Sequence, residues 1–230
     1  SPHTENTYRN EFAQLLMRLG DVPVDKLSPE RLRSYMLFCT GELKLSEATL
    51  HSRLNAIKFY FEQVLKREEF FAEIPRPKKP HTLPKHISPH DVKRLFDHTP
   101  NLKHNTMLRL CYGMGLRVSE LVALKIADID SGTMQVHIRR AKGKKDRYAN
   151  LPTSILEQLR TYFREYRPKE YLFEGQYGGA YTTRSAQAVF KHAMQKAGIN
   201  KNIGIHGLRH SFATHLLEAG TDISLIQKLL

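Results

Sequence analysis

The sequence of 230 residues has few cysteines and no long apolar run. Cys39 and Cys111 are its two cysteines and both stand among apolar neighbours, so we predict buried thiols, with a single disulfide between them as the alternative. No apolar stretch approaches the roughly 18 residues that a membrane span needs. No basic and then apolar segment with a small-residue cleavage site marks the chain for export. These absences predict a cytoplasmic protein that has no membrane partner.

The motifs that commonly hold metals and nucleotides are also missing. The sequence has no glycine-rich P-loop, no dinucleotide-binding fingerprint and no Asp/Glu cluster suited to Mg²⁺. It has neither paired cysteines nor a His-Glu-x-x-His pattern for zinc. We therefore expect no metal and no cofactor. Chemistry on a phosphate would have to rely on arginine, lysine and histidine.

Positive charge is abundant and unevenly distributed. The formal net charge is +13, from 36 basic and 23 acidic residues. Residues 1–74 hold 10 basic and 11 acidic side chains, residues 75–90 hold 4 basic and no acidic ones, and residues 91–230 hold 22 and 12. A positive field of this kind favours a polyanionic partner, most commonly nucleic acid. The alternative is a basic protein that is merely soluble.

Helix signals and one proline-rich segment divide the chain. Residues 1–74 place apolar side chains at helical spacing, with helix start signals at Ser28-Pro29-Glu30 and near Ser46. Residues 75–88 contain a basic, proline-rich run that is typical of an extended linker. We predict a helical domain over 1–74, a linker over 75–88 and a second domain over 89–230.

The second domain is predicted to be α+β. Residues 134–140 alternate apolar and polar side chains as a strand does, and residues 147–151 form the returning strand after a basic turn. Helix signals recur after Ser88 and over residues 104–112, 153–166, 182–198, 206–220 and from 222 onward. The predicted fold class of the chain is therefore mainly α with a small antiparallel β-sheet.

Two clusters contain groups that could act on a phosphate. In Gly113-Met-Gly-Leu-Arg117-Val-Ser-Glu120-Leu, Arg117 stands where a helix begins, so its guanidinium adds to free backbone N–H groups. A structural ion pair with Glu120 is the alternative, and the two roles can coexist. In His206-Gly-Leu-Arg209, the two side chains share a helix face, which pairs a proton-transfer group with a phosphate clamp.

Basic side chains elsewhere are candidate DNA contacts. Thr49, Arg53 and Lys58 lie in the third predicted helix, and the alternative for them is a solvated helix face. Lys78 and Lys79 of the linker are candidates for the phosphate backbone, although many linkers only connect. The hairpin could place a basic tip beside a groove, or its charges could simply protect a strand edge. Its basic residues are Arg139, Arg140, Lys142, Lys144, Lys145 and Arg147.

Three motifs together resemble those of the tyrosine recombinases, the family of lambda-type integrases and Xer recombinases. The motifs follow one another across residues 88–230, and residues 1–74 resemble the helical core-binding domain of that family more loosely. They are Gly-Leu-Arg117-Val-Ser-Glu120-Leu, the Ala141-Lys142-Gly143 hairpin and His206-Gly-Leu-Arg209-His210-Ser-Phe-Ala-Thr-His215-Leu-Leu.

The resemblance implies a site and a reaction. Arg117 and Arg209 would bind the non-bridging oxygens of the scissile phosphate, Lys142 would protonate the leaving 5′ oxygen, and His206 would assist proton transfer at the nucleophile. Glu120 and His210 would support them. A tyrosine would attack to give a 3′-phosphotyrosyl link, so that neither ATP nor metal is needed. The implied partner is a double-stranded DNA recombination site, bound by a homotetramer on two duplexes in the bacterial nucleoid.

The sequence departs from the family pattern at its end. In the family, Gly-His and then the nucleophilic tyrosine follow the segment that matches Gln227–Leu230, and none of the ten tyrosines here stands in that place. We therefore expect a truncated chain that binds DNA without cleaving it. One alternative is a regulatory DNA-binding protein that has lost its nucleophile. The other is a type IB topoisomerase, which shares the chemistry.

Overall fold

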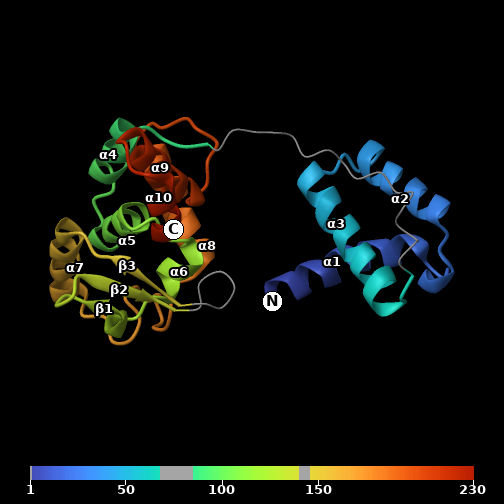
Figure 1. Cartoon of the computed structure of the whole chain (residues 1–230), viewed down its shortest axis with the longest axis horizontal. Coiled ribbons are helices and arrows are strands. Elements are labelled where there is room, and N and C mark those ends of the chain that lie inside the picture. The colour runs from blue at the N-terminus through green and yellow to red at the C-terminus, as the bar shows by residue number, and fades with distance from the viewer. Residues whose placement is uncertain (1, 68–84, 140–145) are drawn as a thin grey trace. The chain divides into compact units, whose positions relative to one another are not determined.

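Two compact units, residues 1–82 and 83–230, make up the chain in the computed structural model (Figure 1). The structure describes residues 2–67, 85–139 and 146–230. Most of these residues are helical, and the one sheet among them has three short antiparallel strands. The predicted fold class is therefore confirmed.

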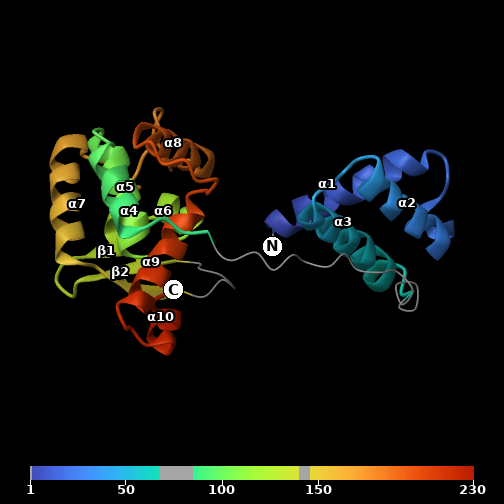
Figure 2. The same cartoon turned by 90° about the horizontal axis from the view of Figure 1, so that it is seen from above.

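The first unit is built from helices. Two of its helices begin where local capping chemistry predicts: Ser28 Oγ accepts a hydrogen bond from the Arg31 N–H at 3.3 Å, and Ser46 Oγ accepts one from the Thr49 N–H at 3.2 Å. Helix α1 lies against α3 (Figure 2). The elements are α1 (Pro2–Leu19), the 3₁₀ turn η1 (Val24–Lys26), α2 (Pro29–Gly41), α3 (Glu47–Phe59) and the π-helical turn η2 (Tyr60–Val64).

Arg53 lies inside this unit, with only 5% of its surface exposed. Its Nε donates to Oε2 of Glu11 in α1 at 2.8 Å. Its Nη1 donates to the Tyr35 hydroxyl at 3.2 Å and to Cys39 Sγ at 3.4 Å. A guanidinium enclosed in this way cannot reach DNA, so the prediction that Arg53 contacts DNA is wrong, and the alternative of a solvated face is wrong as well.

The position of Arg53 on its helix explains the error. Arg53 follows Leu50 by three residues and precedes Ile57 by four, so it falls on the same face of α3 as these buried side chains. Lys58 is turned further outward: its side chain is 31% exposed and its Nζ lies 3.1 Å from Oε1 of Glu62. Thr49 is also partly exposed. For these two residues DNA contact stays a prediction.

The second unit packs helices around a three-stranded sheet. The sheet has the order β1-β2-β3, and Ile138 of β2 pairs with Arg147 of β3 at the end nearest the hairpin turn. Strand β1 was not predicted from the sequence, because it is only two residues long. The described elements are α4 (Pro89–Asp97), α5 (Leu102–Gly113), α6 (Val118–Ala123), the 3₁₀ turn η4 (Ile126–Asp128), β1 (Ile129–Asp130), β2 (Gln135–Ile138), β3 (Arg147–Asn150), α7 (Thr153–Tyr166), α8 (Thr183–Lys196), α9 (His206–Glu218) and α10 (Ile223–Leu229).

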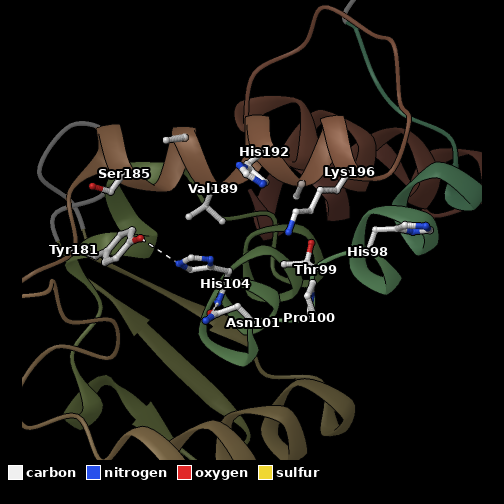
Figure 3. A pocket seen from close by; sticks show the side chains of 12 residues that line it. His98, Thr99, Pro100, Asn101, His104, Tyr181, Ser185, Val189, His192 and Lys196 are labelled. Atoms are coloured by element: carbon white, nitrogen blue, oxygen red, sulfur yellow. Dashed lines mark hydrogen bonds between the residues drawn. The ribbon is translucent and has the colours of Figure 1, made fainter.

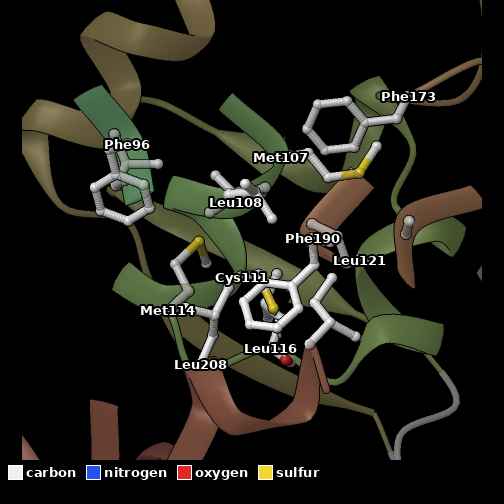
Figure 4. Packing of buried hydrophobic residues seen from close by; sticks show 14 of the residues in the cluster. Phe96, Met107, Leu108, Cys111, Met114, Leu116, Leu121, Phe173, Phe190 and Leu208 are labelled. Carbon is white, nitrogen blue, oxygen red and sulfur yellow. Dashed lines mark hydrogen bonds between the residues drawn. The ribbon is translucent and has the colours of Figure 1, made fainter. Parts of the chain in front are cut away.

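Helix α5 is the centre of this unit and packs against α4, α6, α7, α8 and α9. Its side chains Met107 and Leu108 are fully buried in the core that Figure 4 shows. Leu116 and Leu208, which directly precede the two candidate phosphate-binding arginines, are also fully buried in this core. The core therefore fixes the backbone on which the candidate site is built.

Among the described residues, none of the helices combines the length and the apolar character that crossing a membrane requires.

We predict that Arg53→Ala lowers the free energy of unfolding of the first unit by about 3–5 kcal/mol, because it leaves the Glu11 carboxylate without its buried partner. The control Lys58→Ala breaks a more exposed pair and should cost less than about 1 kcal/mol. Hydrogen exchange of the α1–α3 amides measures both. Equal, small losses for the two variants would contradict the structural role of Arg53.

Candidate active site

The turn between α5 and α6 presents Arg117 at a helix start. Gly115 in this turn has a φ of +58°, and a Cβ there would lie 2.5 Å from Leu230 Cδ2 and 2.8 Å from Phe212 Cδ1, so only glycine fits. Arg117 is the N-cap residue of α6, and its N–H donates to Oε2 of Glu120 at 2.9 Å. The prediction that Arg117 stands where a helix begins is confirmed.

Glu120 is a buried carboxylate shared by three arginines. Arg117 Nη1 lies 2.6 Å from Oε1, whereas Arg147 Nη2 lies 3.1 Å and Arg209 Nη1 lies 3.9 Å from Oε2. Burial alone would raise the pKa of the Glu120 carboxyl, but the hydrogen bonds from Arg117 and the charges of Arg147 and Arg117 outweigh it and leave the pKa below its usual value. Glu120 is therefore ionised at neutral pH and holds the guanidinium groups around it.

Arg209 lies in the first turn of α9 and is 8% exposed. Its Nη1 donates to the carbonyl oxygen of Gly115 and its Nη2 to that of Leu230, both at 2.5 Å. Burial, followed by the charge of Arg117, lowers the pKa of Arg209 to about 10. Arg209 is therefore still a cation at neutral pH, and it lies close enough to Arg117 for the two charges to interact.

His206 is the first residue of α9 and is exposed, as is His210 one turn later. The two imidazole rings are nearly perpendicular, with centroids 4.6 Å apart. Burial of part of its ring, then the charges of His210, Arg209 and Arg117, lower the pKa of His206. A neutral imidazole that can accept a proton at pH 7 thus stands beside the arginine pair.

The hairpin contributes only its base to the described part of the site. Arg140, Lys142, Lys144 and Lys145 lie outside the described residues, as do Lys78 and Lys79 of the linker. The side chain of Arg139 is 55% exposed, and its Nε donates to Oδ1 of the buried Asp128 at 2.6 Å.

Arg147 belongs to the cluster, although its sequence context indicated only a basic residue of the hairpin and not a site residue. Its Nη2 contacts Glu120 and its Nη1 donates to the Leu229 carbonyl oxygen at 2.8 Å. The one sequence signal is its place two residues before Ala149, which puts both side chains on the same face of the strand, and Ala149 is buried. A charge on an inward face indicates an ionic partner, but the sequence does not identify that partner.

A separate cavity of about 470 Å³ lies between the start of α5 and one side of α8 (Figure 3). The hydroxyl of Tyr181 and Nε2 of His104 meet at its edge, 3.4 Å apart. Arg117, His206 and Arg209 are not among the described residues that line it, so the cavity is distinct from the arginine cluster. The polar side chains that line it include His98, Asn101, His104, Tyr181, Ser185, His192 and Lys196.

The cluster thus brings three guanidinium groups, those of Arg117, Arg147 and Arg209, and one neutral imidazole to the same edge of the core. Fork-shaped guanidinium donors match the oxygens of a phosphate, and an imidazole can move a proton near neutral pH. Within the described ranges no group of three or more His, Cys, Asp or Glu side chains is arranged to hold a metal ion.

We predict that His206 titrates below its ordinary value of 6.5 and that His210→Gln raises this pKa, because the variant removes a neighbouring positive charge. A lowered histidine pKa favours the neutral form in the folded state. The His206 contribution to stability is therefore complete above pH 6.5 and declines as the pH falls toward the lowered pKa. An NMR titration of the His206 ring protons measures the shift, with His192→Gln on α8 as a control that should not move it. A pKa at or above 6.5 in the unsubstituted chain would contradict this geometry.

Known proteins match this chain over its full length. Residues 85–230 match the phage integrase family, and residues 1–69 match the phage integrase N-terminal SAM-like domain. The integrase/recombinase y4qK of Sinorhizobium fredii is 42% identical over 233 residues, which cover 100% of this chain and 75% of that protein. Tyrosine recombinase XerD of Oceanobacillus iheyensis is 32% identical over 253 residues, which cover 100% of this chain and 84% of that protein. A lambda integrase tetramer bound to a Holliday junction has the same fold at 16% identity, with a TM-score of 0.82 over 100% of this chain and 68% of that one. The chain therefore belongs to the phage integrase family of tyrosine recombinases, as its motifs predicted.

Proposed function

We propose that this chain supplies the phosphate-binding part of an active site that breaks and rejoins DNA in site-specific recombination. One observation carries the proposal: Arg117 and Arg209, far apart in the sequence, meet around the buried carboxylate of Glu120, with His206 on the same helix as Arg209. Binding DNA requires positive charge, but it does not require two arginines fixed on one carboxylate. Membership of the family supports the proposal.

In this proposal Arg117 and Arg209 bind the two non-bridging oxygens of the scissile phosphate. When a tyrosine oxygen bonds to phosphorus and the bond to the 5′ oxygen breaks, negative charge grows on these oxygens. Guanidinium groups that are already in place stabilise that charge without reorganising. Glu120 keeps them in place, because it is buried, ionised and bonded to Arg117.

The same proposal assigns the protons. Lys142 gives a proton to the leaving 5′ oxygen, and His206 assists the removal of the proton from the attacking tyrosine hydroxyl. The lowered pKa of His206 supports this role, since a neutral imidazole can accept a proton. His210 supports His206 from one turn away. The 3′-phosphotyrosyl link keeps the energy of the broken bond, so rejoining needs no ATP.

We further propose a division of labour along the chain. Residues 1–74 act as a core-binding domain, residues 75–88 as a basic strap and residues 89–230 as the catalytic domain. Thr49 and Lys58 of α3 are the proposed contacts of the first domain, and both are partly exposed. The remaining proposed contacts are Lys78, Lys79, Arg139, Arg140, Lys144 and Lys145.

The proposed partner is a double-stranded recombination site. The lambda integrase with the same fold is a tetramer bound to a Holliday junction. We infer the same assembly here, four copies on two duplexes, in the bacterial cytoplasm at the nucleoid.

None of the tyrosines in these 230 residues serves as the nucleophile in our proposal. All ten precede His206, whereas the motif order of the family places the nucleophile after it. Tyr112 contacts α9, where its hydroxyl hydrogen-bonds to Nδ1 of His215 at 2.8 Å. The 230-residue polypeptide should therefore bind DNA without cutting it.

This prediction is tested by incubating the 230-residue polypeptide with end-labelled duplex DNA. A native gel should show binding that weakens as salt rises, and a denaturing gel should show no covalent protein–DNA band. Arg117→Ala and Arg209→Ala should each weaken binding by roughly 1.5–3 kcal/mol, the range for a hydrogen bond to a charged group. A covalent band would disprove the assignment of the nucleophile. In a parallel assay on supercoiled plasmid DNA, relaxation would indicate a topoisomerase. Duplex binding that neither arginine variant weakens would favour a regulatory DNA-binding protein.

A further inference from the structure

Arg147 occupies a position where the hairpin meets the arginine cluster. It is the first residue of β3 and pairs with Ile138, the last residue of β2. Lys142 lies five residues before it in the sequence. A displacement of Arg147 would therefore move the strand to which the segment with Lys142 is attached.

The side chain of Arg147 joins three segments that are distant in the sequence. From β3, Nη2 reaches Oε2 of Glu120 in α6 at 3.1 Å, and Nη1 reaches the carbonyl oxygen of Leu229 at the end of α10 at 2.8 Å. The side chain is 17% exposed. Its Nε is buried and has no hydrogen-bond partner among the described residues.

A purely structural role explains this arrangement poorly. The neighbouring inward position on β3 is held by the small apolar Ala149, which packs in the core. Burying a guanidinium at such a position costs free energy because the group loses its hydration, and leaving Nε–H without an acceptor lowers the stability further. An apolar side chain would fill the same space without that cost. The ionic contact itself is therefore the feature that needs an explanation.

The geometry at Glu120 supplies one. Oε1 accepts a hydrogen bond from Arg117 Nη1. Oε2 accepts one from the Arg117 N–H at 2.9 Å, and its nearest cation is Arg147 Nη2 at 3.1 Å, with Arg209 Nη1 further away at 3.9 Å. If Arg147 were absent, Oε2 would lose its nearest cation and Arg209 would be the next one. Arg209 would then be drawn into an ion pair with the protein and away from a phosphate.

We propose that Arg147 is a positioning residue. Its contact with Oε2 of Glu120 keeps Arg209 available to a phosphate. The same contact holds the base of the Lys142 hairpin against the arginine pair. The inference rests on the proposed phosphate-binding role of Arg117 and Arg209. It adds a third arginine that acts through Glu120 and does not touch the phosphate itself.

The experiment is a titration of the 230-residue chain with inorganic sulfate. The charge of sulfate is constant between pH 5 and 8. Binding is followed through the Nε–H NMR signals of Arg117 and Arg209. Arg147→Met keeps the bulk of the side chain but removes both contacts, and it should weaken sulfate binding by about tenfold, as the loss of a supporting partner commonly does. Arg147→Lys, which keeps the charge without the fork, should recover only part of the affinity. If Arg147→Met does not fold, Arg147→Lys replaces it as the test variant in the sulfate titration.

Arg94→Met is the matched control. Arg94 also bridges a carboxylate and a backbone carbonyl, since it lies 3.6 Å from Oδ1 of Asp91 and donates to the carbonyl oxygen of Ala197, but it contacts neither Glu120 nor the other arginines. Its variant should leave sulfate binding unchanged. In a crystal structure of Arg147→Met, Arg209 Nη1 should move from 3.9 Å to hydrogen-bond distance of Glu120 Oε2. This movement distinguishes positioning from a general loss of stability.

The outcomes separate this inference from the proposed function. If Arg117→Ala does not change sulfate binding, the arginine pair is not the anion site and the proposed function fails. If Arg117→Ala weakens binding but Arg147→Met does not, only the positioning role of Arg147 is overturned. Full recovery in Arg147→Lys, or an equal loss in Arg94→Met, would overturn it too.

Discussion

The buried carboxylate of Glu120 is the constraint on which the rest of the site depends. A carboxylate removed from water is stable only when cations and hydrogen-bond donors surround it, and here these come from a helix start, a strand and a second helix. One negative charge thus joins Arg117, Arg147 and Arg209. Without it three cations would face one another at the edge of an apolar core, where their repulsion is poorly screened.

The backbone around the cluster is shaped to allow this meeting. Gly115 adopts a left-handed conformation in a space where a side chain would collide, and its carbonyl oxygen accepts a hydrogen bond from Arg209. A Cβ at Gly207 would lie 2.0 Å from Ile203 Cδ1, so α9 begins pressed against the preceding loop. Behind the cluster, burial raises the pKa of the Cys111 thiol to about 12, which leaves a neutral packing group in the core.

The parts of this fold that local chemistry determines could be predicted from the sequence. Ser28, Ser46 and Ser88 cap helices as expected, and Arg117 stands at a helix start. Arg53 was predicted wrongly because the face of a helix that is buried depends on its neighbours, and a long-range partner, Glu11, made a charged residue stable inside. Arg147 was missed for the same reason: its partners Glu120 and Leu229 meet it only through tertiary packing.

In the proposed site Arg117 and Arg209 bind one and the same phosphate. This is tested by a double-mutant cycle between each arginine and single DNA phosphates. The DNA is a duplex selected for binding, and one phosphate at a time is replaced by a neutral methylphosphonate. If both arginines bind one phosphate, Arg117→Ala and Arg209→Ala should each lose their effect at the same single position. Coupling of the two arginines to different phosphates, or to none, would contradict it.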